Sequence, residues 1–106
     1  MKSTLLSASH LQIETDRVLK LFDEAIRLDA LSPGDNSDDV AAARAEKASM
    51  QAFDSAKSLC GWDWEAVSRG GFATWCLKAT PAEILAEGRK KFARAMARRI
   101  RRARAA

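Results

Sequence analysis

The chain has 106 residues, of which 47% are apolar, and a formal net charge of +4. This length accommodates one domain with one modest core and leaves little room for a deep substrate pocket. Alanine is the commonest residue, with 21 copies, and tyrosine is absent. Because alanine loses no side-chain entropy in a helix, this balance favours helices over sheets. We therefore predict one all-α domain over residues 1–106, a compact bundle of four or five helices.

The charge is distributed unevenly along the chain. Residues 1–88 contain 14 acidic and 9 basic residues, whereas residues 89–106 contain 9 basic residues and no acidic one. The body of the protein is therefore mildly acidic and its C-terminal segment strongly basic. Because opposite charges steer association, we expect a partner attracted by charge to meet the C-terminal segment.

Residues that could hold a metal or form disulfides are few. The chain has two cysteines, Cys60 and Cys76, and one histidine, His10. A structural zinc site needs four ligands and a secreted disulfide framework needs more cysteines, so we expect no metal, no cofactor and reduced thiols. A catalytic dyad would require His10 to meet a cysteine in an activating environment. No second histidine could share the proton transfers, and we expect no enzyme.

The chain carries no pattern typical of secretion or membrane insertion. Its opening residues contain one lysine and only two consecutive leucines, which is short of the apolar region of a signal peptide. No apolar run approaches the roughly 18 residues of a transmembrane helix. We therefore expect a cytoplasmic protein without a membrane partner.

The segment from about His10 to Leu31 predicts the first helix. Its apolar residues fall within one broad arc, which indicates contact with more than one neighbour. Ser9 followed by Gln12 resembles a capping box at its start. Two ion pairs are expected at the favourable i,i+4 spacing, namely Asp16–Lys20 and Asp23–Arg27.

A turn at residues 32–36, which contains Pro33 and Gly34, separates this helix from a second one. We expect the second helix to open at Ser37-Asp38-Asp39, with carboxylates at the positive end of the helix dipole, and to continue to Cys60. Gly61 follows where a left-handed C-terminal residue belongs. Small residues along one side let another backbone approach closely, which predicts a long antiparallel helical hairpin: Ala41, Ala45, Ala48, Ala52 and Ala56, joined by Phe53 and Leu59.

The next segment predicts shorter elements. Trp62–Val67 resembles the start of a third, short helix, with Asp63 as its cap, and Gly70-Gly71 ends it. Phe72–Ala79 has apolar residues that fit a helical face or a buried strand. We predict a helix there.

Three tryptophans gather in this part of the chain: Trp62, Trp64 and Trp75. Large aromatic residues dominate small cores, so these rings could cap one end of the bundle. Tryptophan is also enriched among the residues that anchor protein partners. Base stacking is a third option, although only Arg69 and Lys78 are nearby and Glu65 opposes them. We take Trp62 and Trp64 as candidate partner-binding residues.

The sequence Thr80-Pro81-Ala82-Glu83 predicts the start of the last helix. Threonine caps the helix, proline occupies the first helical position, and glutamate returns to the N–H of the cap. We expect this basic helix to run to about Arg102, with residues 101–106 as a frayed tail. Its apolar stripe consists of Leu85, Phe92, Met96, Ile100 and Ala103.

Opposite that stripe lies a cationic face. At about 100° per residue, seven cations occupy an arc of about 160°, and Arg89 and Arg99 flank the stripe. The helix dipole favours cations near a C-terminus, and this effect explains two or three of them. It does not explain a segment with nine basic residues and no acidic residue. Seven of the nine are arginines, which suit bidentate recognition of phosphate or carboxylate. The candidate partner-binding cations are Arg89, Lys90, Lys91, Arg94, Arg98, Arg101, Arg102 and Arg104; a solvated helix end is the simpler alternative.

The chain as a whole resembles anti-CRISPR proteins of the type I-E class, several of which are compact helical bundles. The residues that carry the likeness are Trp62-Asp63-Trp64-Glu65 and Lys90-Lys91-Phe92-Ala93-Arg94. The resemblance implies a non-catalytic inhibitor from a phage or mobile element, acting in the cytoplasm of a bacterial host. Its partner would be a protein of the CRISPR-Cas surveillance complex or the nuclease that the complex recruits.

A second hypothesis rests on the basic helix alone. In it the protein is a sequence-tolerant nucleic-acid-binding protein that contacts phosphates through its C-terminal helix. Such binding would weaken steeply with salt, with a log–log slope of about −5 for six neutralised phosphates on duplex DNA.

Overall fold

The computed structural model describes residues 7–31, 39–61 and 78–105. Within these residues the chain is all-helical and contains three helices and no strand. The helices are α1 (Ala8–Leu31), α2 (Asp39–Cys60) and α5 (Pro81–Ala105). The predicted all-α class is confirmed, whereas the predicted count of four or five helices is not, because three are found in the described ranges.

The predicted short elements fall in a part of the chain that the structure does not describe. Trp62–Val67 and residues 72–77 lie outside the described residues. Lys78 and Ala79, which end the segment predicted as Phe72–Ala79, form a turn and a bend that lead into α5. The helix expected there does not include these two residues.

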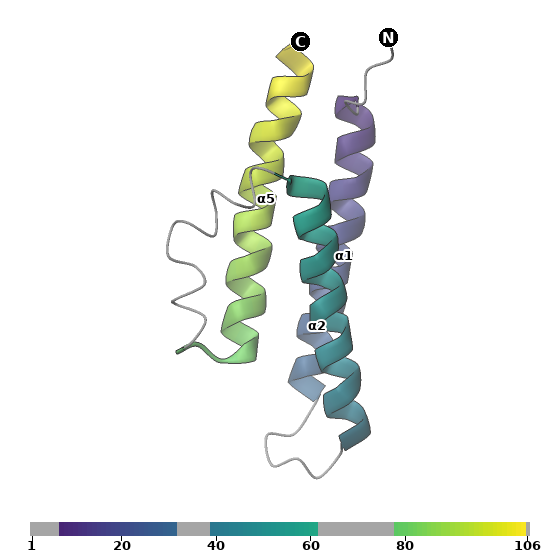
Figure 1. The fold of residues 1–106 in the computed structure, drawn as a ribbon, viewed down its shortest axis with the longest axis vertical. Helices are drawn as coiled ribbons and strands as arrows, with labels where there is room; N and C mark the ends of the chain where they lie inside the picture. Colours follow the sequence, from purple (N-terminus) through teal and green to yellow (C-terminus); the bar gives the residue numbers. More distant parts are fainter. Residues whose placement is uncertain (1–6, 32–38, 62–77, 106) are drawn as a thin grey trace.

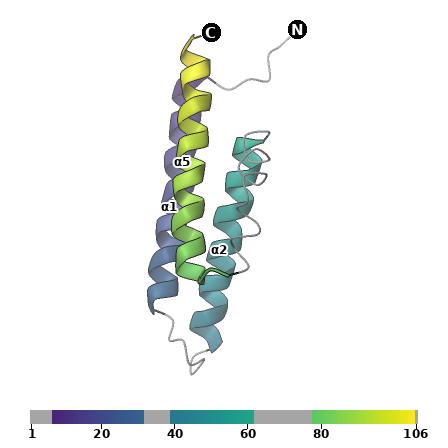
Figure 2. The same cartoon turned by 90° about the vertical axis from the view of Figure 1, so that its left-hand side faces the viewer.

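The three helices lie side by side along one long axis (Figures 1 and 2). α1 and α2 form the predicted antiparallel hairpin, and α5 runs in the direction of α2, so that α1 begins and α5 ends at the same end of the molecule. The described part is elongated, within overall extents of 54 × 26 × 20 Å. None of its helices combines the length and apolar character needed to cross a bilayer.

One continuous core joins the three helices, and Phe22 of α1 lies at its centre. The ring of Phe22 meets the ring of Phe53 of α2 edge to face, with centroids 5.2 Å apart, and lies 6.0 Å from that of Phe92 of α5. The broad apolar arc of α1 is explained by this position between both neighbours. The fully or nearly fully buried apolar residues of the core are Leu11, Val18, Phe22, Ala25, Ala52, Ala56, Cys60, Leu85, Phe92, Ala95, Met96 and Ile100.

α1 begins two residues earlier than predicted, and its cap is Ser7 rather than Ser9. The backbone N–H of His10 donates to Ser7 Oγ at 3.1 Å, and that of Leu11 donates to the Ser7 carbonyl at 2.9 Å. Gln12 does not complete a capping box. Its amide donates instead to Asp16 Oδ1, one turn further along the helix, at 3.1 Å.

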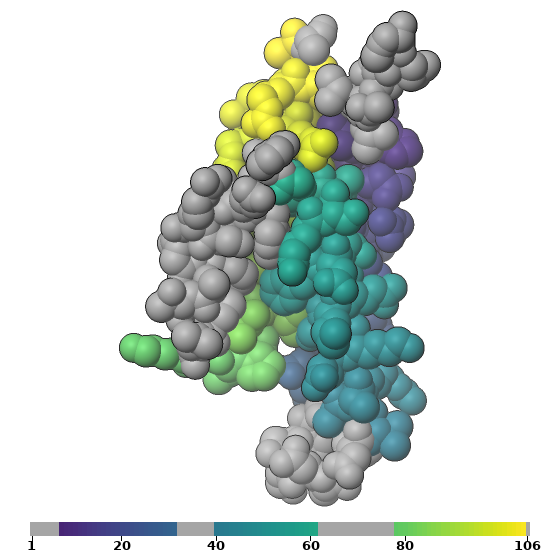
Figure 3. Space-filling view, in the orientation of Figure 1, coloured from purple at the N-terminus to yellow at the C-terminus, as the bar shows by residue number. Residues whose placement is uncertain are grey.

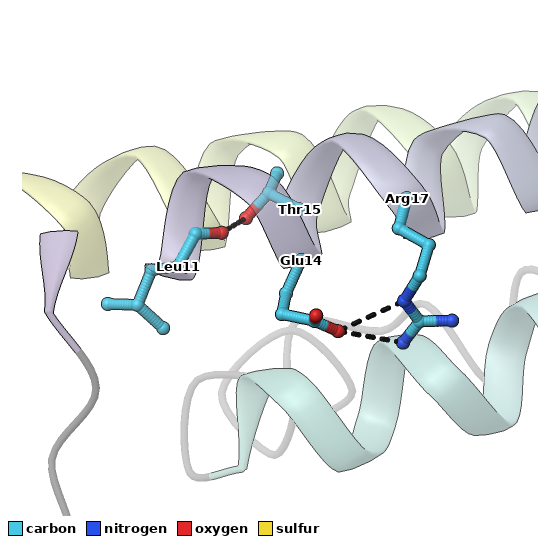
Figure 4. Close-up of polar contacts among 4 residues, drawn as sticks. All are labelled: Leu11, Glu14, Thr15 and Arg17. Atoms are coloured by element: carbon cyan, nitrogen blue, oxygen red, sulfur yellow. Dashed lines mark hydrogen bonds and ion pairs between the residues drawn. The ribbon is translucent and has the colours of Figure 1, made fainter. Parts of the chain in front are cut away.

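The two ion pairs predicted on α1 are replaced by others. Arg27 pairs with Glu24 at the i,i+3 spacing, and Arg17 pairs with Glu14 at the same spacing (Figure 4). Asp23, the expected partner of Arg27, pairs across the bundle with α5. Guanidinium groups reach a carboxylate three residues away as readily as four, so the spacing alone does not select the partner.

A buried hydroxyl on α1 is satisfied within its own helix. Thr15 Oγ1 donates to the Leu11 carbonyl at 2.6 Å (Figure 4). Because an unpaired hydroxyl in the core would cost free energy, this bond lets Thr15 occupy a core position. Among the described buried side chains, no polar atom lacks a hydrogen-bond partner.

The small-residue side of α2 is the side that faces the bundle. Ala45, Ala52 and Ala56 are buried, and Ala48 packs against the core. The helix ends as predicted, because Gly61 adopts a φ of 57° and its N–H donates to the Lys57 carbonyl at 3.0 Å. A residue with a Cβ would be strained in this left-handed conformation.

Candidate functional site

The candidate site is the outward face of α5. Helix α5 packs on the α1–α2 hairpin through Leu85, Phe92, Met96 and Ile100, all of which are buried as predicted. Six basic side chains on its other side are exposed, and we call them the α5 cationic face: Lys90, Arg94, Arg98, Arg101, Arg102 and Arg104. From Lys90 to Arg104 this face extends about 21 Å, at about 1.5 Å per residue. α5 has no acidic residue beyond Glu87.

The start of α5 is held by the predicted capping box. The backbone N–H of Thr80 donates to Glu83 Oε1 at 2.8 Å, and the N–H of Glu83 donates to Thr80 Oγ1 at 3.2 Å. The hydrogen bond from the Thr80 backbone N–H, followed by the interaction with the Thr80 side chain, lowers the pKa of Glu83 below its ordinary value. Pro81 takes the first helical position, where its missing N–H leaves nothing unpaired.

Gly88 lies on the side of α5 that faces the bundle and allows close packing against α2. This glycine is buried in the middle of the helix, and the ring of Phe53 lies directly over it. A Cβ at this position would lie 2.6 Å from both Cε1 and Cζ of Phe53. Because only a residue without a side chain fits beneath the ring, this contact directs the opposite side of α5 to solvent.

Arg89 ties α5 to α1. Its Nε donates to Asp23 Oδ1 at 2.7 Å, and its Nη2 donates to Asp23 Oδ2 at 3.3 Å. The two hydrogen bonds form a bidentate ion pair between α5 and α1. Arg89 was predicted to bind a partner because of its charge. Its guanidinium already has a carboxylate partner within the chain, so we leave Arg89 out of the α5 cationic face.

Arg99 ties α5 to the end of α2. Its Nη1 donates to the carbonyl oxygens of Leu59 and Cys60, the latter at 3.1 Å. The last carbonyls of a helix have no partner in the helix itself and carry the negative end of its dipole. Arg99 therefore acts as a side-chain cap of α2 and is not available to a ligand.

Lys91 lies at the edge of the face and also has a partner. Its Nζ is 3.7 Å from Glu87 Oε2, one turn earlier on α5, and the side chain is only partly exposed. Of the eight cations predicted to bind a partner, the structure therefore brings six together on an exposed face and places Arg89 and Lys91 in intramolecular ion pairs. The predicted tryptophans, Trp62 and Trp64, lie outside the described residues.

Other chemistry has little support in the described part of the molecule. No group of three or more described histidine, cysteine, aspartate or glutamate residues could hold a metal ion. Cys60 is 1% exposed, whereas a reactive thiolate needs solvent access. A cavity of about 320 Å³ lies near the start of α5, far from the C-terminal half of the cationic face; it is lined by Asp29, Ala42, Ala45, Glu46, Ser49, Phe53, Pro81, Ile84 and Leu85.

Sequence reasoning missed the role of Gly88. A signal was present, because Gly88 is the one glycine among residues 81–105 and a glycine inside a helix costs about 1 kcal/mol relative to alanine. Such a glycine usually has a packing reason, which here is the ring of Phe53. Nothing local to Arg99 indicates that it caps α2, since the carbonyls that it binds lie 39 and 40 positions away in the sequence.

Comparison with known proteins gives no match to a family model, to a curated protein or to a solved structure. The α5 cationic face is therefore the feature of the molecule from which a function can be inferred.

Proposed function

We propose that the protein is a non-catalytic binding protein that uses the α5 cationic face to bind the phosphate backbone of nucleic acid without reading its sequence. The observation that carries the proposal is six exposed cations, five of them arginines, on one side of a helix whose rotation is fixed by the core. Guanidinium groups bind phosphate through two parallel hydrogen bonds, and phosphate contacts alone supply most sequence-independent affinity.

The arrangement of these cations works against folding. Lys90, Arg94 and Arg98 follow one another at the i,i+4 spacing, where like charges destabilise a helix by about 0.2–0.5 kcal/mol per pair. The helix dipole relieves this repulsion only in the last turn, which contains Arg102 and Arg104. A polyanionic ligand would relieve it along the whole face, which supports a binding role over a solvated helix end.

A salt titration with matched variants tests the proposal. We expect fluorescence anisotropy to show binding to labelled duplexes of unrelated sequence, with a log–log salt slope of about −5 for six phosphate contacts. The variant Arg94→Glu/Arg98→Glu/Arg101→Glu reverses three charges of the face and should abolish this binding. The matched control is Arg44→Glu/Lys47→Glu/Lys57→Glu, which changes the net charge equally but on the exposed side of α2.

Both variants should remain folded, because exposed charges typically contribute less than about 1 kcal/mol each. Thermal melts of the two proteins check this. If the variant with the reversed α5 face melts like the control and still binds nucleic acid, the proposal is wrong. Binding that does not respond to salt would also contradict it.

The resemblance to type I-E anti-CRISPR inhibitors is a second proposal, and the same face supports it. A rigid, arginine-rich surface about 21 Å long could dock on an RNA-guided surveillance complex or on its recruited nuclease and block interference. A plasmid-interference assay in bacteria with a type I-E system tests it. Wild type and the α2 control should protect the plasmid, and the α5 charge reversal should not.

A further inference from the structure

Resting on the proposed nucleic-acid binding, we infer that the ligand is double-stranded DNA and that α5 lies in its major groove. The observation behind this is the spread of the cations around α5. At about 100° per residue, the six cations span about 160° around the helix axis, and within this arc Arg98 and Arg104 lie about 120° apart, with Arg94 and Arg101 between them. The cationic face is thus convex. We call its midline the crest, and Arg98 and Arg104 lie on opposite sides of it.

A single phosphate strand cannot meet this arrangement. It follows one line along the helix, so cations on the opposite flank would point away from it. A groove of duplex DNA has a phosphate strand on each side, and a helix lying in the groove can reach both strands at once. The flanking position of Arg98 and Arg104 on either side of the crest therefore favours a groove over a strand.

The dimensions of the groove favour B-form DNA. Its major groove is about 12 Å wide and admits a helix, whose diameter with side chains is about 10–12 Å. The major groove of A-form RNA is deep and narrow, and side chains do not enter it. At about 3.4 Å per base pair, the 21 Å of the cationic face corresponds to about six base pairs.

The C-terminal turns of α5 project from the rest of the described bundle (Figure 2). Seen from the α5 side, the helix lies in front of α1, and its C-terminal turns continue past the end of α2 (Figure 2). These turns form part of one end of the molecule in the space-filling view (Figure 3). Arg101 and Arg104 lie in this projecting part, beyond Arg99, which marks the level at which α2 ends.

The described phenylalanines are not placed for base stacking, the usual means of holding single strands. Proteins that bind single strands place bases on exposed aromatic rings. The phenylalanines among the described residues are Phe22, Phe53 and Phe92; Phe22 and Phe92 are buried in the core, and Phe53 packs against it. None of these three rings is therefore exposed as a platform for a base.

The test compares three ligands and two flanks with the full chain. Anisotropy is measured on a DNA duplex of about 20 base pairs, on one of its strands, and on an RNA duplex of the same sequence, over a range of salt concentrations. We expect the DNA duplex to bind at least about tenfold more tightly than either other ligand. Arg98→Gln and Arg104→Gln should each reduce the salt slope by about 0.9, the value for one phosphate, and Lys47→Gln on α2 should not change it.

The outcomes separate this inference from the proposal on which it rests. Equal affinity for the single strand or the RNA duplex would overturn the inference and leave nucleic-acid binding intact. A slope that changes with only one of the two flanking arginines would overturn it as well, because a ligand on one side of the crest is then sufficient. Absence of binding to all three ligands would instead overturn the proposed function.

Discussion

The ring of Phe53 occupies the space that a side chain at position 88 would need, so that α5 and α2 are in close contact at Gly88. The distance from an added Cβ to Phe53 Cε1 and Cζ would be 2.6 Å, and to Phe22 Cε1 3.5 Å. Phe53 also makes the edge-to-face contact with Phe22 at the centre of the core. Phe53 of α2 therefore contacts both α1, through Phe22, and α5, at Gly88. Gly88 lies on the side of α5 opposite the cationic face.

Replacing Gly88 with alanine should destabilise the protein. Alanine favours a helix interior by about 1 kcal/mol over glycine, but the added methyl group would displace the Phe53 ring and its contact with Phe22. Overpacking of this kind costs about 1–3 kcal/mol, so we expect a net loss measured by urea unfolding. In the background Phe53→Ala the same substitution should be neutral or stabilising, since the ring is gone. Stabilisation of the otherwise unchanged protein by Gly88→Ala would contradict the contact.

Replacing Phe92 with alanine should cost about 3–5 kcal/mol, because the ring is fully buried against Phe22 and its removal leaves a cavity. A domain of this size has a total stability of about 5–15 kcal/mol, so the variant should melt far below wild type. Ala97→Gly on the exposed side of α5 is a control that should cost only about 1 kcal/mol. Similar melting temperatures for the two variants would show that the core does not depend on this ring.

Replacing Arg99 with methionine should destabilise the end of α2. The substitution keeps an unbranched apolar stem and removes the donor to the Leu59 and Cys60 carbonyls. Hydrogen bonds that involve a charged group contribute about 1.5–3 kcal/mol, and we expect a loss near the lower end because the group is only partly buried. Arg98→Met, its neighbour on the exposed face, should leave stability unchanged. Urea unfolding of both variants measures the difference, and equal stabilities would argue against the cap.

The capping box at the start of α5 should contribute to stability in a pH-dependent way. The pKa of Glu83 is lowered in the folded state from the ordinary value of 4.5, first by the Thr80 backbone N–H and then by its side chain. A depressed pKa means that the ionised carboxylate stabilises the fold above pH 4.5 and that this contribution is lost as the pH falls through the folded pKa. Glu83→Gln should therefore lower the melting temperature at neutral pH and have little effect well below the folded pKa.

The control for this pH series is Glu46→Gln, which removes an exposed carboxylate of α2 that caps no helix. Melts of the three proteins from neutral to acid pH check the prediction. A difference between wild type and Glu83→Gln that stays constant with pH would show that the carboxylate charge has no part in the cap.

The sequence by itself determined the class of the fold, the C-terminal end of α2 and the start of α5. These features depend on interactions within a few residues: helical periodicity, the reciprocal bonds between Thr80 and Glu83, and the left-handed conformation of Gly61. The start of α1 was predicted wrongly for the same reason, since Ser7 and Ser9 are both plausible caps and local pattern does not distinguish them. The buried stripe of α5 followed from periodicity and was predicted correctly.

Only the tertiary structure decided which cations remain exposed for a ligand. Arg89 and Arg94 are chemically identical in the sequence, yet Arg89 meets Asp23, which lies 66 positions away, and Arg94 is exposed. Arg98 and Arg99 are adjacent, yet only Arg99 reaches the end of α2. A helical wheel assigns each side chain a direction but not a neighbour, because the neighbour depends on how far α5 is turned and shifted against the hairpin. Here the buried stripe of α5 and the ring of Phe53 over Gly88 together define that position.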